Sequence, residues 1–298
     1  MNHNDAFSRY HPLVNFLYFA LVLLGAMVLR HPACQVISLI GAVAVFVTLG
    51  GEKPGGFRLW YALALFVLTA AVNPAFSHEG QTILRYLPSG NPLTLESILY
   101  GLGAGLTLCT ALIWFSDYTR VMTSDKFVYL FGRIVPALSL VLSMTLRFVP
   151  RFSAQARRVS RAQAAVGNNM HAGSPVHRIR CALMVFSILV TWSLENAVDT
   201  ADSMRARGYG LPGRSAFSIF TLTTRDKLLL SVMGGLGGIV IAGYAFGALS
   251  WRYYPSVKGA GFAPLSVLCY LSFLILNLIP VILEQKEAAV CRRLQSQI

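Results

Sequence analysis

The chain has 298 residues, of which 55% are hydrophobic and only 12% are charged. Soluble domains carry roughly 25% charged residues, so most of this chain is expected to avoid water. Its net charge of +13 would suggest nucleic acid in a soluble protein, but in a membrane protein basic residues first report topology. The composition therefore favours a membrane protein and argues against a nucleic-acid partner.

Six uncharged runs are long enough to cross about 30 Å of hydrocarbon, which takes about 20 helical residues. In chain order they are residues 12–29, 32–51, 59–77, 97–116, 228–251 and 259–283. No acidic or basic residue lies inside them, which disfavours a proton relay. Glycines four residues apart (Gly101/Gly105, Gly234/Gly238 and Gly243/Gly247) favour close helix packing, more within the chain than between copies.

Two further apolar runs, 134–146 and 181–194, are shorter and are bounded by charged residues. Runs of about 10–14 residues are more often interfacial or buried helices than spans. Both are therefore interpreted as helices that lie along the membrane surface or under another protein. In the rival reading, 134–146 is a span that continues through Arg147 and Phe148.

Lys and Arg gather in cytoplasmic loops, and the segment 147–227 alone carries twelve of them against four acidic residues. The sequence thus predicts an all-α polytopic membrane protein with about six transmembrane helices and both termini cytoplasmic. Its parts are a four-helix membrane part (1–116), a cytoplasmic helical domain (117–227) inserted between the fourth and fifth spans, and a two-helix membrane part (228–298). Arg252 and Lys258 fit this topology least well, because they fall outside.

Two helices are expected in the basic segment. The first is predicted to start near Pro150, because proline is tolerated in a first turn, and to end near Gly167. The second should run from Pro175, with Ser174 as its N-cap, to Arg207, and should stop at Gly208. Phe152, Ala156, Val159 and Gln163 would share one face of the first helix, and Asp202 and Arg205 could pair on the second.

No motif predicts a catalytic residue, a metal site or a cofactor. The glycines 208, 210 and 213 match GxGxxG only formally, since no strand precedes them, and Walker A, HExxH and GxSxG sequences are absent. The five cysteines form no CxxC pair and are expected to be buried thiols. They are Cys34, Cys109, Cys181, Cys269 and Cys291.

The stretch 201–214, ADSMRARGYGLPGR, resembles a signature of the transmembrane T component of energy-coupling factor (ECF) transporters. In that family an Ala-Arg-Gly motif ends a cytoplasmic coupling helix, and here it would be Ala206, Arg207 and Gly208, with Arg205 beside it. Residues 146–150 (LRFVP), with Arg147, Phe148 and Pro150, resemble the start of the family's coupling helices. His31-Pro32 and Asn73-Pro74 are similar to family features as well.

The family often carries a second Ala-Arg-Gly motif at the end of the earlier coupling helix. Here Val166 stands where its arginine would be, although Gly167 is present. The resemblance places the corresponding docking residues at Arg161, Ala162, Gln163 and Gly167, with Arg161 as a candidate substitute for the missing arginine.

The resemblance implies a non-catalytic coupling subunit in a prokaryotic cell membrane. Its partners would be two cytoplasmic ATPase subunits, a small membrane S component that binds a vitamin or metal ion, and the lipid bilayer. Two alternatives remain. A self-contained secondary transporter would need polar groups at mid-span or repeated broken helices, and a lipid-acting enzyme would have to use His78 with Glu79 or His171 with His177. Basic residues beside a membrane also commonly just set topology and contact anionic lipid.

Overall fold

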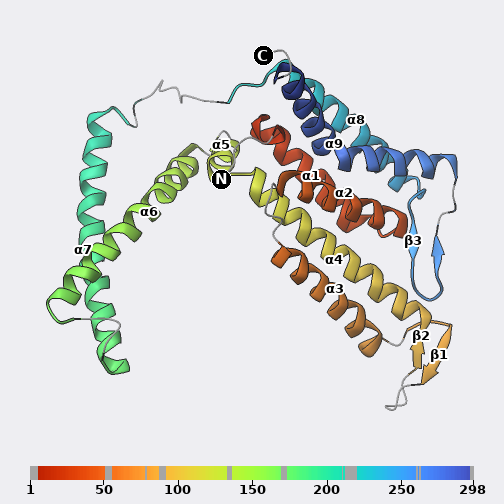
Figure 1. Cartoon of the computed structure of the whole chain (residues 1–298), viewed down its shortest axis with the longest axis horizontal. Coiled ribbons are helices and arrows are strands. Elements are labelled where there is room, and N and C mark those ends of the chain that lie inside the picture. The colour runs from red at the N-terminus through yellow and green to blue at the C-terminus, as the bar shows by residue number, and fades with distance from the viewer. Residues whose placement is uncertain are drawn as a thin grey trace. The chain divides into compact units, whose positions relative to one another are not determined.

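The computed structural model describes residues 6–50, 56–77, 79–86, 92–132, 136–168, 173–209, 211, 220–259, 261 and 263–295. They form two compact units, Met1–Thr123 with Phe220–Ile298, and Ser124–Ile219. Helices make up most of both (Figure 1), so the all-α polytopic class predicted from the sequence is confirmed. Some residues weighed above, such as His78, His171 and Gly210, lie outside the described residues.

The first unit contains a helix at each of the six predicted spans. They are α1 (Pro12–Val28), α2 (Pro32–Gly50), α3 (Gly56–Phe76), α4 (Leu95–Val121), α8 (Thr224–Ala245) and α9 (Pro264–Gln295), with the short 3₁₀ helix η1 (Phe7–Arg9) before them. By length and composition α2, α4, α8 and α9 can cross a membrane, whereas α1 and residues Trp60–Phe76 of α3 are shorter apolar helices.

Several helices continue beyond the apolar runs that predicted them. Helix α4 therefore includes Glu96 and Asp117 near its two ends, and both side chains are buried. The Asp117 carboxylate oxygens have no hydrogen-bond partner in the described part of the chain. Helix α9 reaches past Leu283, so Cys291 is exposed. The expectation of five buried thiols is wrong for Cys291, because the helix continues beyond its apolar segment, and Cys109 is only partly buried.

Two short antiparallel hairpins, which the sequence did not reveal, lie at one end of the first unit. They are β1 (Ile83–Tyr86) with β2 (Pro92–Thr94), and β3 (Trp251–Arg252) with β4 (Lys258–Gly259). In Figure 1 both are at the end where α1 turns into α2. Each joins two helices of the membrane body, and the strands are too short for a period-two pattern to show.

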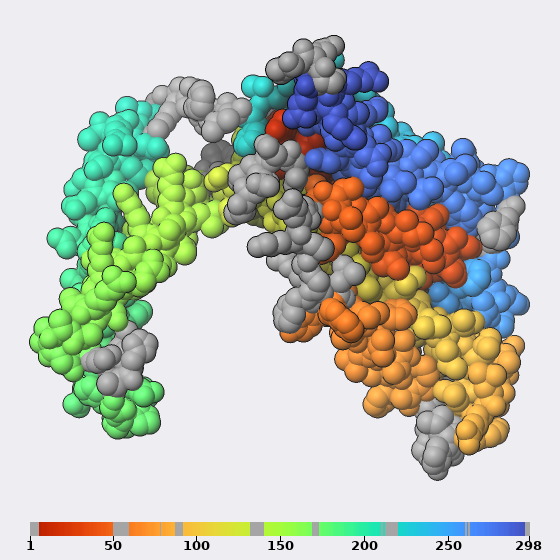
Figure 2. All heavy atoms as spheres, viewed as in Figure 1, coloured from red at the N-terminus to blue at the C-terminus, as the bar shows by residue number. Residues whose placement is uncertain are grey.

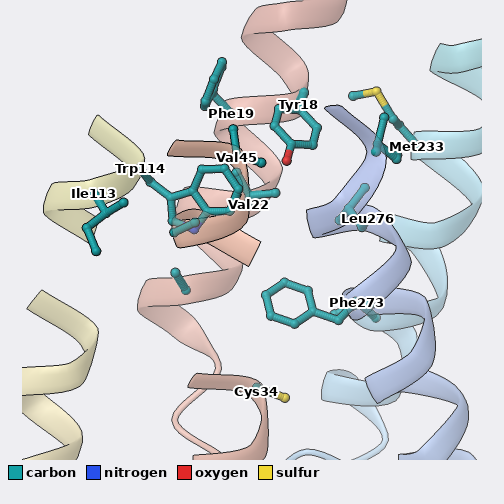
Figure 3. Close-up of a cluster of buried hydrophobic side chains, with 14 of the residues drawn as sticks. Tyr18, Phe19, Val22, Cys34, Val45, Ile113, Trp114, Met233, Phe273 and Leu276 are labelled. Atoms are coloured by element: carbon teal, nitrogen blue, oxygen red, sulfur yellow. The ribbon is translucent and has the colours of Figure 1, made fainter. Parts of the chain in front are cut away.

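The core of the first unit is aromatic and joins helices from both ends of the chain. Figure 3 shows Trp114 of α4 beside Tyr18 and Phe19 of α1, with Phe273 and Leu276 of α9 nearby. The Trp114 indole N–H donates to the Ser38 hydroxyl at 3.1 Å, and the Tyr18 hydroxyl donates to the Asn277 carbonyl at 2.9 Å. These bonds satisfy the polar ends of buried aromatic side chains.

The glycine pairs behave differently from one another. A Cβ at Gly101 would lie 3.0 Å from the Ala70 carbonyl oxygen, and one at Gly105 would lie 2.9 Å from that of Phe66. Close packing of α4 on α3 thus needs both glycines, as predicted. Gly234 and Gly238 have nothing within 4 Å of such a Cβ. The prediction of packing within the chain is wrong for that pair, because it lies on an exposed face of α8.

Hydrogen bonds and an ion pair gather the N-terminal segment, the start of α8 and the end of α9 at the opposite end from the hairpins. The Ala6 amide donates to Glu284 at 2.9 Å, the His11 amide donates to Asp226 at 3.1 Å, and Arg9 pairs with Glu287 at 4.0 Å. The chain leaves α4 at this same end, since Arg120 lies over the ring of Phe46 near the end of α2. The chain therefore leaves the first unit after α4 and re-enters it before α8 at this one end, where α1 begins and α9 ends.

The start of α8 is fixed by a capping box. The Thr223 amide donates to Asp226 Oδ2 at 2.8 Å, and the Asp226 amide donates back to Thr223 Oγ1 at 3.4 Å. We predict that Thr223→Ala lowers the free energy of unfolding by about 1 kcal/mol, because a helix N-terminus loses its cap. Thermal unfolding in detergent measures the change, and Thr223→Ser should stay close to the natural protein. An unchanged Thr223→Ala midpoint would contradict the role of this cap.

Candidate functional site: the ends of two long helices

The second unit consists of a short helix, α5 (Ser124–Gly132), and two long ones, α6 (Pro136–Ala165) and α7 (Pro175–Ala206). Figure 1 shows α6 and α7 crossing each other. Phe148 of α6 stacks on Trp192 of α7 with ring centroids 5.8 Å apart, and Phe152 contacts the same indole at 6.4 Å. On α7, Cys181, Val185 and Leu189 are buried at four-residue spacing. This spacing places one face of α7 against its neighbour.

The second helix has the bounds that the sequence predicted, to within one residue. The Ser174 hydroxyl accepts from the His177 amide at 3.3 Å, and Pro175 is the first helical residue. Asp202 and Arg205 pair at 3.8 Å with both side chains exposed. Such a surface pair contributes little to stability. It directs the Arg205 side chain toward the preceding turn of the helix rather than beyond its C-terminus.

The C-terminus of α7 ends in a Schellman motif. The Tyr209 amide donates to the Met204 carbonyl at 3.0 Å, and the Gly208 amide donates to the Arg205 carbonyl at 2.9 Å. Gly208 adopts φ +74°, which only glycine accepts without strain. Arg207 is the C-cap residue. Its side chain is exposed and forms no ion pair within the described residues.

The C-terminus of α6 has the same backbone geometry. The Asn168 amide donates to the Gln163 carbonyl at 2.9 Å, the Gly167 amide donates to the Ala164 carbonyl at 3.1 Å, and Gly167 has φ +95°. Ala165, Val166 and Gly167 therefore occupy the positions that Ala206, Arg207 and Gly208 occupy on α7. We call these two triplets the α6 tip and the α7 tip.

The two tips differ in chemistry. The α7 tip presents a guanidinium with five donors in a fixed fork, suited to carboxylates, at the helix end where a cation is favoured by the dipole. The α6 tip presents Val166, whose side chain is 78% exposed. Val166, where the family motif would have an arginine, therefore occupies on α6 the same backbone position that Arg207 occupies on α7.

The other candidate residues of the α6 tip have separate positions. Arg161 and Ala162 are exposed one turn before the tip. Gln163 is half-buried, and its side-chain oxygen accepts from Asn168 Nδ2 at 2.9 Å. It therefore supports the turn itself. Arg161 lies five residues before Val166 and does not occupy the position of the missing arginine.

The α7 tip suggests how the α6 tip could be altered. If the tips dock ATPase subunits, as the resemblance implies, Val166→Arg is expected to tighten that binding several-fold, because it places a second unpaired guanidinium on the same backbone geometry. Affinity of the purified proteins, measured by surface plasmon resonance, checks this, with Val166→Gln as the uncharged control. Equal affinity for both variants would contradict a contribution of charge at position 166 to the binding.

The predicted start of the first coupling helix is wrong. Arg147, Phe148 and Pro150 lie inside α6, which begins by Pro136 and runs on to Ala165. Pro150 removes only the amide that would bond the Leu146 carbonyl, and the helix continues past it. The described part of the run, residues 136–146, and the basic helix after it are therefore one element, as the rival reading had for Arg147 and Phe148. Residues 134 and 135 lie outside the described residues. Within its described part, α6 does not meet the length and apolarity of a span.

The interpretation of the run 181–194 as too short to cross a membrane is also corrected. It belongs to the 32-residue helix α7, which is long and apolar enough to span by composition. Its bounding charges, Arg180 and Glu195, lie within the helix and do not end it. Length therefore gives no ground for keeping α7 out of the membrane.

Sequence reasoning missed two features of this unit. One is Trp192, whose i+3 position after Leu189 continues the buried face and could have been found from helical periodicity. The other is the burial of Lys126 on α5, where desolvation lowers the pKa to about 8. No group of three or more His, Cys, Asp or Glu side chains suited to a metal occurs among the described residues.

These observations define a polytopic α-helical membrane protein with a pair of long helices whose ends are matched. The family model described as "CbiQ: Cobalt transport protein" matches residues 7–219, more than half of the chain. The chain therefore belongs to the CbiQ family, which includes the transmembrane proteins of energy-coupling factor transporters.

Relatives named "Energy-coupling factor transporter transmembrane protein EcfT" are similar to much of the chain. The one from Bacillus selenitireducens is 33% identical over 65% of this chain and 78% of its own length. The one from Thermotoga maritima is 30% identical over 70% and 80%. The match to the relative from Exiguobacterium sibiricum, at 32% identity, spans only 35% of this chain and 40% of that protein.

Proposed function

We propose that this chain is the membrane coupling subunit of an ECF importer. It would transmit the motion of two cytoplasmic ATPase subunits to a small membrane S component that carries a vitamin or a metal ion. The observation that carries the proposal is the pair of tips, which end two long helices in one backbone geometry. The family's motif residues Ala206, Arg207 and Gly208 form one of them.

The helix pair suits the transmission of motion. Helices of 30 and 32 residues are about 45–48 Å long at 1.5 Å per residue. The Phe148–Trp192 stack and the buried face of α7 join them along their crossing. A displacement of either tip would therefore move α6 and α7 together and would not be absorbed by the bending of a loop.

The surface of α7 away from α6 is apolar and suits an S component or lipid. Along it Ile179, Leu183, Phe186, Leu194 and Val198 are each 59–65% exposed. Exposed apolar stripes of this length mark a protein or membrane contact. The residues of the α7 tip are polar or small by contrast. Helix α7 therefore has a docking end that is distinct from its apolar side.

The charges at the two ends of the first unit support one orientation. The hairpin end carries four described basic residues, Arg30, Arg85, Arg252 and Lys258, whereas the end where α1 begins and α9 ends carries Arg9, Arg120, Arg225, Lys227, Lys286, Arg292 and Arg293. Under the positive-inside rule the second of these ends would be cytoplasmic. The second unit, which is connected there, then begins and ends on the ATPase side. The S component, a different chain, would determine which compound is transported.

Affinity purification of the tagged chain from native membranes, followed by mass spectrometry, tests the proposal. We expect two ATPase polypeptides, or one in two copies, together with a small hydrophobic membrane protein. Uptake of a solute by the purified chain alone in liposomes would instead support the self-contained transporter. Recovery of the chain without any ATPase under mild detergent would contradict the proposal.

A further inference from the structure

The end of the first unit that bears the hairpins contains an open cleft of ≈ 1080 Å³. It lies where α1 ends at Val28 and α8 ends at Ala245, with the β3–β4 hairpin forming another wall. Figure 2 shows this end, where the blue residues of the C-terminal part adjoin the red and orange residues of α1 and α2. Because α8 is a membrane-span candidate, its end marks the boundary of the hydrocarbon.

Among the described residues that line this cleft, three side chains are cationic and none is acidic. They are Arg30, Arg252 and Lys258. None of the three forms an ion pair within the described ranges, and all are exposed. With Arg85, they are the described basic residues that the topology leaves on the non-cytoplasmic side, where a membrane protein ordinarily has few.

The strand register adds an independent observation. Arg252 lies directly opposite Lys258 across the β3–β4 ladder, so both side chains project from the same face at close range. Like charges in that arrangement repel each other and destabilise the hairpin. An anion bound between the two side chains would attract both of them and so offset their repulsion. An arginine guanidinium beside a lysine ammonium matches the oxygens of a phosphate.

The remaining walls are suited to a lipid. Met27, Val28 and Tyr244 are 45–56% exposed and line the same cleft as the cations. Tyr100, Trp251 and Tyr254 surround an adjoining hollow of ≈ 330 Å³ that shares Arg30 and Arg252. Aromatic residues gather at the headgroup level of membranes. Cationic side chains beside an apolar wall, at the end of a membrane-span candidate, match a phosphate headgroup and its acyl chain.

We infer that this cleft binds an anionic phospholipid of the non-cytoplasmic leaflet, with Arg30, Arg252 and Lys258 holding the phosphate. Bound lipid would neutralise the Arg252–Lys258 pair and tie the hairpin to the ends of α1 and α8. The inference concerns the first unit alone and does not depend on how the tips dock.

Native mass spectrometry of the purified full chain tests this inference, with phosphatidylglycerol and phosphatidylcholine offered at equal concentration. We expect retained phosphatidylglycerol to exceed phosphatidylcholine, and the double variant R252Q/K258Q to retain at least about fivefold less of it. R252K/K258R should keep the lipid. Arg85→Gln, on β1 among the exposed residues of the same end, is the matched control and should also keep it.

A second arm separates a lipid site from a phosphate site. Millimolar inorganic phosphate should leave the bound phosphatidylglycerol in place, whereas a short-chain phosphatidylglycerol should displace it. Displacement by phosphate alone, equal retention of both lipids, or unchanged retention in R252Q/K258Q would each overturn the inference. Circular dichroism confirms folding of each variant, and the single variant R252Q replaces the double variant if that one does not fold.

Discussion

Arg207→Glu is expected to reduce the binding of ATPase partners by at least about tenfold. Removing one partner of a close interfacial charge pair typically costs about 2–5 kcal/mol, and each 1.4 kcal/mol is a factor of about ten. Arg207 is the exposed C-cap residue of α7, and no acid within the described residues neutralises it. Its reversal would place a carboxylate at the helix end where negative charge is disfavoured.

The measurement is a pull-down of purified ATPase on the immobilised chain, with Arg180→Glu as the control. Arg180 is an exposed arginine near the other end of the same helix, so its reversal alters net charge equally without touching the tip. Arg207→Lys should fall between the two, because lysine keeps the charge and loses the fork. Equal losses for both reversals would show that overall charge, rather than the tip, governs docking.

Trp114→Ala is expected to lower the free energy of unfolding by about 3 kcal/mol. The indole is fully buried, and Tyr18 and Phe19 lie with ring centroids 6.0 and 6.2 Å away. Within a membrane the loss comes from van der Waals contacts and the remaining cavity rather than from transfer out of water. Ser38 would also lose the indole N–H that it accepts from, which adds to the loss.

Phe115→Ala provides the comparison for this change. Phe115 is the next residue on α4, and its side chain is 50% exposed, so its truncation leaves no enclosed cavity. Thermal unfolding in a single detergent should show a clear decrease in midpoint for Trp114→Ala and little change for Phe115→Ala. Similar midpoints for the two variants would contradict the central position of Trp114 in the core.

The positions of the helices could be predicted from the sequence because apolar runs report them directly. Their ends could not, since α4 and α9 continue into charged residues that solvent or other helices accommodate. The same limitation explains why Pro150 was predicted to begin a helix but lies within α6. A proline can begin a helix, but it can also sit within one when a single carbonyl is left without a donor, and local sequence does not distinguish the two.

The two tips could be predicted from the sequence only in part. Gly167 and Gly208 signal helix ends by residue type, and the motif resemblance pointed to Arg207. The equivalence of Val166 with Arg207 became firm only through the matching backbone hydrogen bonds. The face that joins α6 to α7 through Phe148 and Trp192 depends on the crossing of the two helices, which no local pattern encodes.

Site-specific photocrosslinking tests the central proposal most directly. A photoreactive residue placed at position 207, and separately at 166, in the assembled complex is predicted to crosslink to the ATPase subunits. The same residue at Phe186, on the exposed apolar side of α7, should crosslink to a membrane protein or to lipid instead. Crosslinks from position 207 only to lipid or to this chain itself would contradict docking through the α7 tip.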